Sequence, residues 1–279
     1  MKALQVIISS YMRAPHQVIR NIRWRRAKTI SDHKIIFVVG SPRSGTTLME
    51  RVLHAHSQLF SAQRETGLLS PRNIFSRNHF GLSTEDNQAL FAQSRDVVDF
   101  FTNAAKLMES RNGGQTLIEK TPQHILRIEF LVQHFPQARF IHIVRDGRDA
   151  YCSSRKHPNV RLNSSAAYAK YWKRCIDAGL AVRDNPIVHT IRYEDFTTDP
   201  AKHLGAVMTF LGHDLESIQI DATAVKADER ASFERHKRLA APISNATVGR
   251  WRNEMTASEV QDFQAIAGDE LRAFQYDID

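Results

Sequence analysis

The polar side chains best suited to chemistry lie in one short stretch that follows an apolar run at residues 35–39. The stretch reads Gly40-Ser41-Pro42-Arg43-Ser44-Gly45-Thr46-Thr47, and an apolar-periodic segment continues from Leu48. A strand, a glycine-bounded loop and a helix N-terminus in that order cradle an anion, because the loop amides and the helix dipole converge on it. We therefore expect this loop to bind a phosphorylated compound.

The cation of this loop distinguishes it from the phosphate loop of nucleoside triphosphatases. Its glycines fit the G-x-x-x-x-G frame of that motif, in which Lys and then Ser or Thr must follow. Here Thr46 and Thr47 follow, and the nearest cation is Arg43. A kinase or nucleoside triphosphatase, which would also need magnesium, is thus an alternative that lacks its lysine.

A second set of candidate ligands follows a later apolar strand at residues 139–144. Arg145 comes directly after it, and Ser153 comes eight residues further on, two helical turns away. A guanidinium and a hydroxyl at this spacing suit another phosphate. The strand could also be read as a magnesium-binding one, but its acid, Asp146, directly follows an arginine. The sequence therefore indicates two separate phosphates and no metal.

Strands and helices alternate along most of the chain, with further apolar strands expected at 59–62, 116–118 and 187–191. This alternation predicts an α/β class, a P-loop-like three-layer fold in which helices flank a central, mostly parallel sheet. Ligands of such folds lie beyond the carboxyl ends of the strands. The 40–47 loop would meet four further side chains there: Glu65, Lys120, Arg145 and Tyr193.

Length and composition describe an ordinary globular chain. It has 279 residues, 42% hydrophobic and 24% charged, and no clean linker or repeat. We expect a basic helical extension over residues 1–30 and a single domain over 31–279. The net charge of +8 and the pI near 9.7 predict an anionic partner. Charge alone does not choose between a nucleotide, an acidic acceptor, nucleic acid and a membrane surface.

Cellular location has only indirect indicators. The two cysteines, Cys152 and Cys175, fit a reducing compartment. No apolar run approaches the roughly 20 residues of a membrane span, and the apolar start at 4–8 is too short for a signal peptide. We expect a cytoplasmic protein. For the 1–30 extension we favour a solvated basic helix packed on the domain over docking on an anionic membrane or acceptor.

These motifs resemble those of sulfotransferases that use 3'-phosphoadenosine 5'-phosphosulfate (PAPS). The 40–47 loop is similar to the family's 5'-phosphosulfate loop, and residues 144–153 are similar to its 3'-phosphate motif. Four more motifs recur in the family: Glu119-Lys-Thr-Pro122, Arg192-Tyr-Glu-Asp195, Phe210-Leu-Gly212 and Gly249-Arg-Trp251. The resemblance runs from residue 35 to about 255 and looks closest to the bacterial and Golgi-type branch, which includes tyrosylprotein sulfotransferases.

The resemblance implies a set of cofactor ligands. The 5'-phosphosulfate would be bound by Arg43, Ser44, Gly45, Thr46 and Thr47. The 3'-phosphate would be bound by Arg145 and Ser153, with Tyr193 near the adenine or that phosphate. A segment that closes over the nucleotide would contain Arg250 and Trp251. Ala241 stands before Pro242 where relatives often carry a lysine, so the C-terminal cation that reaches the cofactor is unassigned. The basic 221–250 stretch suits either a closing loop or a solvated one.

Sulfuryl transfer resembles phosphoryl transfer in its loose, in-line transition state, so positioned cations and amides supply most of the catalysis and no metal is required. We place Arg43 and Lys120 on the leaving phosphate. Glu65 is the expected general base, because it stands where the branch carries its catalytic glutamate. Two alternatives remain open. Lys120 could form only a salt bridge at its strand end, and Glu65 could form an ion pair with Arg64 or another local arginine. His124 is the rival base, although a helix-surface histidine explains it better.

Three classes of function are compatible with these residues. A PAPS-dependent sulfotransferase, which releases adenosine 3',5'-bisphosphate, is favoured over the kinase or triphosphatase. A non-catalytic nucleotide or polyanion binder would leave Glu65 and Lys120 without a role. No motif identifies the acceptor, which could be a protein tyrosine, a carbohydrate, a glycolipid or a small metabolite. The basic surface favours an acidic acceptor, and we expect no nucleic-acid partner.

Overall fold

The computed structural model describes residues 17–62, 64–70, 72–76, 78–155, 162, 164–220 and 243–278, together with residues 8, 9 and 12. The strands are β1 (Ile36–Gly40), β2 (Leu59–Ser61), β3 (Thr116–Lys120), β4 (Arg139–Val144) and β5 (Val188–Arg192). The α-helices are α2 (Gln17–Arg25), α3 (Thr46–His54), α4 (Thr84–Gln93), α5 (Val97–Arg111), α6 (Ile128–His134), α7 (Gly147–Arg155), α8 (Ser165–Leu180), α9 (Tyr193–Thr198), α10 (Pro200–Leu211), α11 (Trp251–Glu254) and α12 (Ala257–Ala273). Short 3-10 helices are η1 (Ile74–Ser76), η2 (Pro122–Arg127) and η3 (Ser217–Gln219).

The five strands form one sheet in the order β2-β3-β1-β4-β5, and every pair between them is parallel. β1 therefore lies at the centre, with Val38 opposite Lys120 of β3 and Gly40 opposite Ile143 of β4. The carboxyl ends of β1, β3 and β4 consequently meet at one edge, as the parallel arrangement requires. The predicted α/β fold with a parallel central sheet is confirmed.

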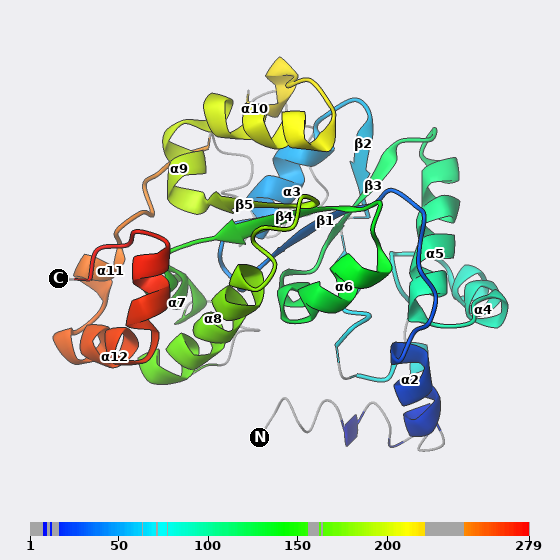
Figure 1. The fold of residues 1–279 in the computed structure, drawn as a ribbon, viewed down its shortest axis with the longest axis horizontal. Helices are drawn as coiled ribbons and strands as arrows, with labels where there is room; N and C mark the ends of the chain where they lie inside the picture. Colours follow the sequence, from blue (N-terminus) through cyan, green and yellow to red (C-terminus); the bar gives the residue numbers. More distant parts are fainter. Residues whose placement is uncertain are drawn as a thin grey trace.

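Helices cover both faces of the sheet, which makes three layers (Figure 1). Successive side chains of β1 point to opposite faces. Phe37 and Val39 join a core shared with α5, α6 and α8, whereas Ile36 and Val38 join a core shared with α3, α9 and α10. A third apolar cluster packs α7, α8 and α12 together. The near-continuous apolar runs of the strands are thus buried on both sides.

The described part of the basic extension packs against this domain through one aromatic residue. Trp24 of α2 is only 8% exposed. Its ring lies 4.9, 5.6 and 6.1 Å, between centroids, from Phe75, Phe91 and Phe100. α2 is therefore attached to the main core.

Several expectations fall on parts of the chain that the structure does not describe. Most of the basic 221–250 stretch, with Ala241 and Pro242, lies in residues 221–242, outside the described ranges.

Among the residues that the structure describes, no helix is both long and apolar enough to traverse a lipid bilayer. Cys152 and Cys175 are buried and unpaired.

Candidate active site

The loop between β1 and α3 has the backbone that an anion cradle needs. Gly45 adopts φ 101°, ψ 9° at the start of α3, and a Cβ there would collide with the ring of Tyr193. Arg43 also has a positive φ, 74°, which is uncommon for a residue with a side chain. No side chain caps α3, so its first-turn amides remain available to an anion. Both unusual conformations serve to curl the loop around one point.

Three polar atoms of this region are buried without a hydrogen-bond partner. They are Ser41 Oγ, Ser44 Oγ and Arg145 Nε, whose residues are 1%, 0% and 5% exposed. Leaving a buried polar group unpaired costs roughly 1–3 kcal/mol, so a ligand group that pairs with these atoms would bind favourably. An oxyanion would satisfy the Ser44 hydroxyl and the Arg145 guanidinium alike. The residues present therefore fit a bound phosphate group.

The two predicted phosphate sites are adjacent. Arg43 Nε donates to Ser153 Oγ at 3.2 Å, and Arg145 Nη1 donates to the Arg43 carbonyl oxygen at 3.4 Å. Arg145 also lies over the Tyr193 ring, 4.4 Å from its centroid. Burial is the largest cause of a lowered Arg43 pKa, and repulsion from Arg145 and Arg250 lowers it further. Clustered, partly desolvated guanidinium groups of this kind favour a multiply charged anion.

The predicted base and the predicted catalytic lysine are in direct contact. Lys120 Nζ donates to Glu65 Oε1 at 2.8 Å and lies 3.7 Å from Glu50 Oε2. The Lys120 side chain is 5% exposed and that of Glu65 47%. Glu65 thus pairs with Lys120 rather than with Arg64, and its carboxylate is reachable from solvent. Glu50, which was not predicted, lies beneath the lysine on α3.

A buried carboxylate connects the segments that carry this pair. Glu119 accepts hydrogen bonds from Thr66 Oγ1 at 2.9 Å and Thr121 Oγ1 at 2.5 Å, and contacts His124 Nδ1 at 3.0 Å. Thr66 follows Glu65 directly, so this network fixes the base relative to the end of β3. His124 is 2% exposed and lies in the core. The expectation of a helix-surface histidine was therefore wrong.

The segment that precedes α11 contacts the predicted 3'-phosphate site through Thr247, a residue that was not predicted. Thr247 accepts from Arg145 Nη2 through its carbonyl oxygen at 2.8 Å and through Oγ1 at 3.0 Å. Asp149 holds this segment, because its carboxylate accepts from the amides of Gly249 and Trp251 at 2.7 and 2.9 Å. No sequence motif marked Thr247.

The last two predicted ligands have other partners here. Arg250 forms an ion pair with Glu254 at 2.7 Å. The Trp251 ring lies between Arg148 and Arg252, whose guanidinium carbons are 3.7 and 4.5 Å from its centroid. Both residues contact other parts of the C-terminal region here, and their contact with the cofactor stays a prediction.

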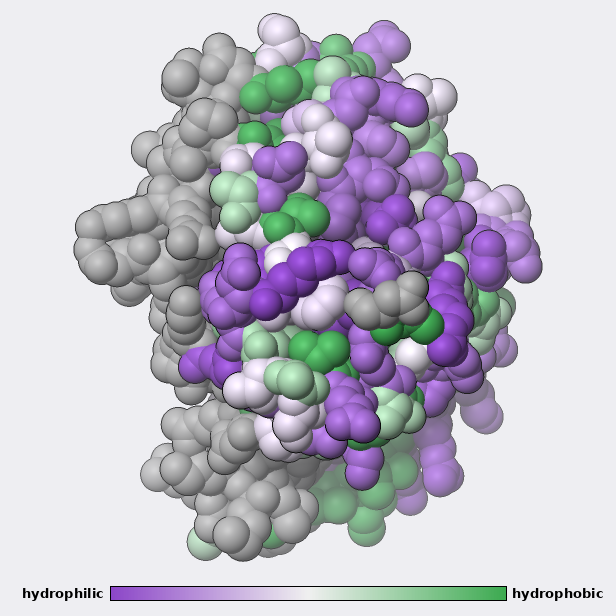
Figure 2. Space-filling model, turned by 90° about the vertical axis from the view of Figure 1, so that its left-hand side faces the viewer, coloured by the Kyte–Doolittle hydropathy of each residue, from purple (hydrophilic) through white to green (hydrophobic). Residues whose placement is uncertain are grey.

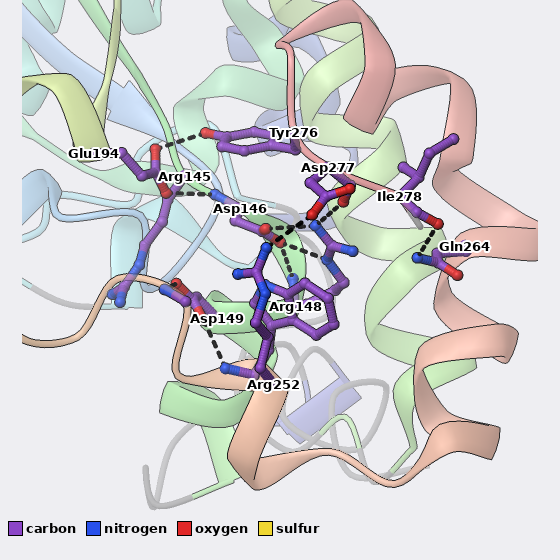
Figure 3. A network of polar contacts seen from close by, with 12 residues as sticks. Arg145, Asp146, Arg148, Asp149, Glu194, Arg252, Gln264, Tyr276, Asp277 and Ile278 are labelled. Atoms are coloured by element: carbon purple, nitrogen blue, oxygen red, sulfur yellow. Dashed lines mark hydrogen bonds and ion pairs between the residues drawn. The ribbon is translucent and has the colours of Figure 1, made fainter.

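A second polar network secures the end of β4 beside Arg145 (Figure 3). Glu194 accepts from the Asp146 amide at 3.0 Å and from the Tyr276 hydroxyl at 2.8 Å. Asp146 pairs with Arg148 at 2.8 Å, and Arg148 also donates to the Asp277 carbonyl oxygen. The carboxylate of Asp146 is thus engaged in an ion pair with Arg148. Within the described residues, no group of three or more His, Cys, Asp or Glu could hold a metal ion.

The fold and this edge define a P-loop-like α/β protein with a candidate anion site at the carboxyl ends of its central strands. A family model described as the sulfotransferase family matches residues 36–217, and the chain belongs to that family. The family resemblance inferred from the motifs is therefore confirmed.

Individual relatives agree with this assignment. Protein-tyrosine sulfotransferase of Drosophila melanogaster is 26% identical over 261 residues, 84% of this chain and 50% of the relative. The sulfotransferase domain of the Synechococcus PCC 7002 olefin synthase has a similar structure, with a TM-score of 0.61 and 21% identity over 92% of this chain and 99% of that domain. Mouse sulfotransferase SULT7A1, solved in complex with PAP, gives a TM-score of 0.56 at 17% identity over 88% of this chain and 86% of the mouse chain. The chain spans about half the length of the tyrosine sulfotransferases that it matches.

Proposed function

We propose that this protein transfers the sulfuryl group of PAPS to a hydroxyl or amine of an acceptor and releases adenosine 3',5'-bisphosphate. The observation that carries the proposal is the half-buried Arg43 in contact with the buried Arg145, beside an unpartnered Ser44 hydroxyl. This pair is complementary to a ligand with two phosphate groups. Membership of the sulfotransferase family and the mouse relative solved with PAP support the same cosubstrate.

The two phosphate groups of the ligand would be bound by two different sets of residues. Arg43, Ser44 and the amides of Gly45, Thr46 and Thr47 would hold the 5'-phosphosulfate at the start of α3. Arg145 and Ser153 would hold the 3'-phosphate, and Tyr193, whose ring is packed between Gly45 and Arg145, would support both. Thr247 would then give up its contacts with Arg145, or share them, as the 3'-phosphate enters.

PAPS supplies the group that moves: the bond between sulfur and the 5'-phosphate oxygen breaks while sulfur bonds to the acceptor atom. Glu65 takes the proton that the acceptor loses, because its carboxylate is solvent-reachable at this edge. Lys120 leaves Glu65 to stabilise the leaving oxygen, which frees the base at the same moment. Glu50 remains as the second carboxylate against the lysine. His124 is 2% exposed and contacts Glu119, so we favour Glu65, whose side chain is 47% exposed, as the base.

An acidic acceptor would be complementary to the positive net charge of the protein. The net charge of +8 attracts an anionic substrate, and several relatives are named as protein-tyrosine sulfotransferases. We therefore place acidic peptides that contain tyrosine first among the acceptors to be tried, followed by carbohydrates.

Replacing Glu65 by Gln tests the catalytic part. We expect adenosine 3',5'-bisphosphate to bind with unchanged affinity, whereas transfer of radiolabelled sulfate to a panel of acceptors falls by a factor of at least about 100. The exposed Glu85→Gln variant is the control and should keep full activity. Normal transfer by the Glu65 variant would remove this residue from the mechanism, and loss of nucleotide binding would mean that it acts structurally.

A further inference from the structure

Helix α2 buries Trp24 but exposes its aliphatic residues. Successive residues of an α-helix are about 100° apart, so Val18, Ile19 and Ile22 share one arc. These side chains face outward and are 38%, 62% and 49% exposed. Asn21 and Trp24 lie on the opposite arc and are buried. An ordinary surface helix would turn its aliphatic residues inward.

Specific hydrogen bonds fix this orientation. Asn21 Nδ2 donates to Asn73 Oδ1 at 2.9 Å, and Asn21 Oδ1 accepts from the Ile74 amide at 2.8 Å. Asn73 Nδ2 in turn donates to Gln17 Oε1 at 2.6 Å. Rotating the helix to bury its aliphatic residues would break this buried amide network and leave its groups unpaired. The outward aliphatic face is therefore specified by the fold.

The arginines of this region form two sets. Arg20 and Arg25 serve the fold, since Arg20 lies 3.9 Å from the Phe75 ring centroid and Arg25 donates to a backbone carbonyl. Arg23 and Arg26 share the outer arc with the exposed aliphatic residues. α2 itself contains no acidic residue, and neither outer arginine pairs with an acid among the described residues.

A shallow hollow beside the outer arc gathers these cations. Its lining consists of Arg23, Arg26, Lys28, Thr29, Arg95 and Asp96. Asp96 accepts from the amides of Lys28 and Thr29, each at 3.1 Å, and caps α5, so its single charge offsets only part of the positive charge of the four cations. Arg95 is paired with Asp99 at 2.9 Å. Arg23, Arg26 and Lys28 are left facing solvent together.

We propose that the outer arc of α2 and this hollow form a docking surface for an anionic lipid bilayer. Ile19 and Ile22 would enter the boundary between headgroups and acyl chains while the cations contact lipid phosphates, the pattern of an interfacial helix. The face that carries α11 and α12 is mostly hydrophilic by contrast (Figure 2). This inference is independent of the proposed sulfuryl transfer, because none of its residues belongs to the candidate active site.

Co-sedimentation of the full chain with lipid vesicles tests the proposal. We expect binding to phosphatidylcholine vesicles that contain about one third phosphatidylglycerol, little binding to pure phosphatidylcholine, and release at high salt. Arg23→Gln/Arg26→Gln should weaken binding roughly thirtyfold, since each basic residue near an anionic surface contributes about a fivefold factor. Ile19→Asp/Ile22→Asp should abolish it.

The matched control is Arg183→Gln/Lys202→Gln, which removes the same charge from exposed positions elsewhere. It should bind vesicles like the wild type, and thermal unfolding should show that every variant is folded. Equal losses in the control and the Arg23/Arg26 variant would reduce the effect to net charge and overturn the proposal. Absence of wild-type binding to the anionic vesicles, including association with an acidic protein instead, would overturn it as well.

Discussion

Removing the carboxylate of Glu119 should destabilise the protein and disturb the base at the same time. Glu119 is 1% exposed and receives Thr66 Oγ1, Thr121 Oγ1 and the His124 ring. Glu119→Ala removes the acceptor that these buried groups share, at about 1–3 kcal/mol for each hydrogen bond lost. Because the two hydroxyls can rotate to other acceptors, we expect a loss of about 4 kcal/mol and a Tm lower by roughly 10 °C.

The pH dependence of this effect has a definite sign. Burial by itself raises the pKa of Glu119, but the His124 ring and the hydroxyl hydrogen bonds outweigh it, so the pKa lies below its usual value. The carboxylate therefore contributes stability above its unfolded pKa of about 4.3, and this contribution is lost as the pH falls through the folded pKa. The Tm difference between wild type and Glu119→Ala should shrink in that acidic range.

Thermal unfolding followed by circular dichroism measures both effects. Glu85→Ala, which removes an exposed carboxylate, should leave the Tm nearly unchanged. At permissive temperature, Glu119→Ala should lower turnover more than nucleotide affinity, because Thr66 no longer fixes the adjacent Glu65. A Tm within about 2 °C of the wild type at neutral pH would refute the reasoning.

Two further changes probe the phosphate loop. Gly45→Ala should weaken binding of adenosine 3',5'-bisphosphate at least tenfold by calorimetry, because φ is 101° and Tyr193 occupies the space of a Cβ; Gly114→Ala, with φ +80° and open space, is the control and should bind normally. Ser44→Ala should leave the Tm of the free protein unchanged or higher, because the hydroxyl has no protein partner, yet reduce bisphosphate affinity roughly tenfold. A drop in Tm without a loss of affinity would contradict the ligand role of Ser44.

Local sequence patterns were sufficient for the sheet and the loop. The apolar runs and the glycines of residues 35–47 determine where β1 ends and where α3 begins, with no help from distant residues. Arg145 was equally predictable, since it directly follows a buried parallel strand. Such features depend on residues that are adjacent in the sequence, so they can be predicted from one sequence.

Contacts between distant segments were not predictable in the same way. Lys120 meets Glu65 and Glu50 only because β3 lies between β1 and β2, an order that no local pattern encodes. His124 read as a surface residue because its partner, Glu119, becomes buried only in the folded sheet. Thr247 had no motif, and its position follows from the contacts that Asp149 makes with the C-terminal segment.

Calorimetric titration with adenosine 3',5'-bisphosphate, run beside ATP with magnesium, tests the cosubstrate most directly. We expect tight, magnesium-independent binding of the bisphosphate that Arg145→Ala weakens roughly 10- to 100-fold, since a hydrogen bond to a charged group contributes about 1.5–3 kcal/mol. Arg139→Ala, at the opposite end of the same strand, should bind like the wild type. Preference for magnesium-ATP, or equal affinity of the Arg145 variant and the wild type, would contradict the assignment of the two-phosphate site.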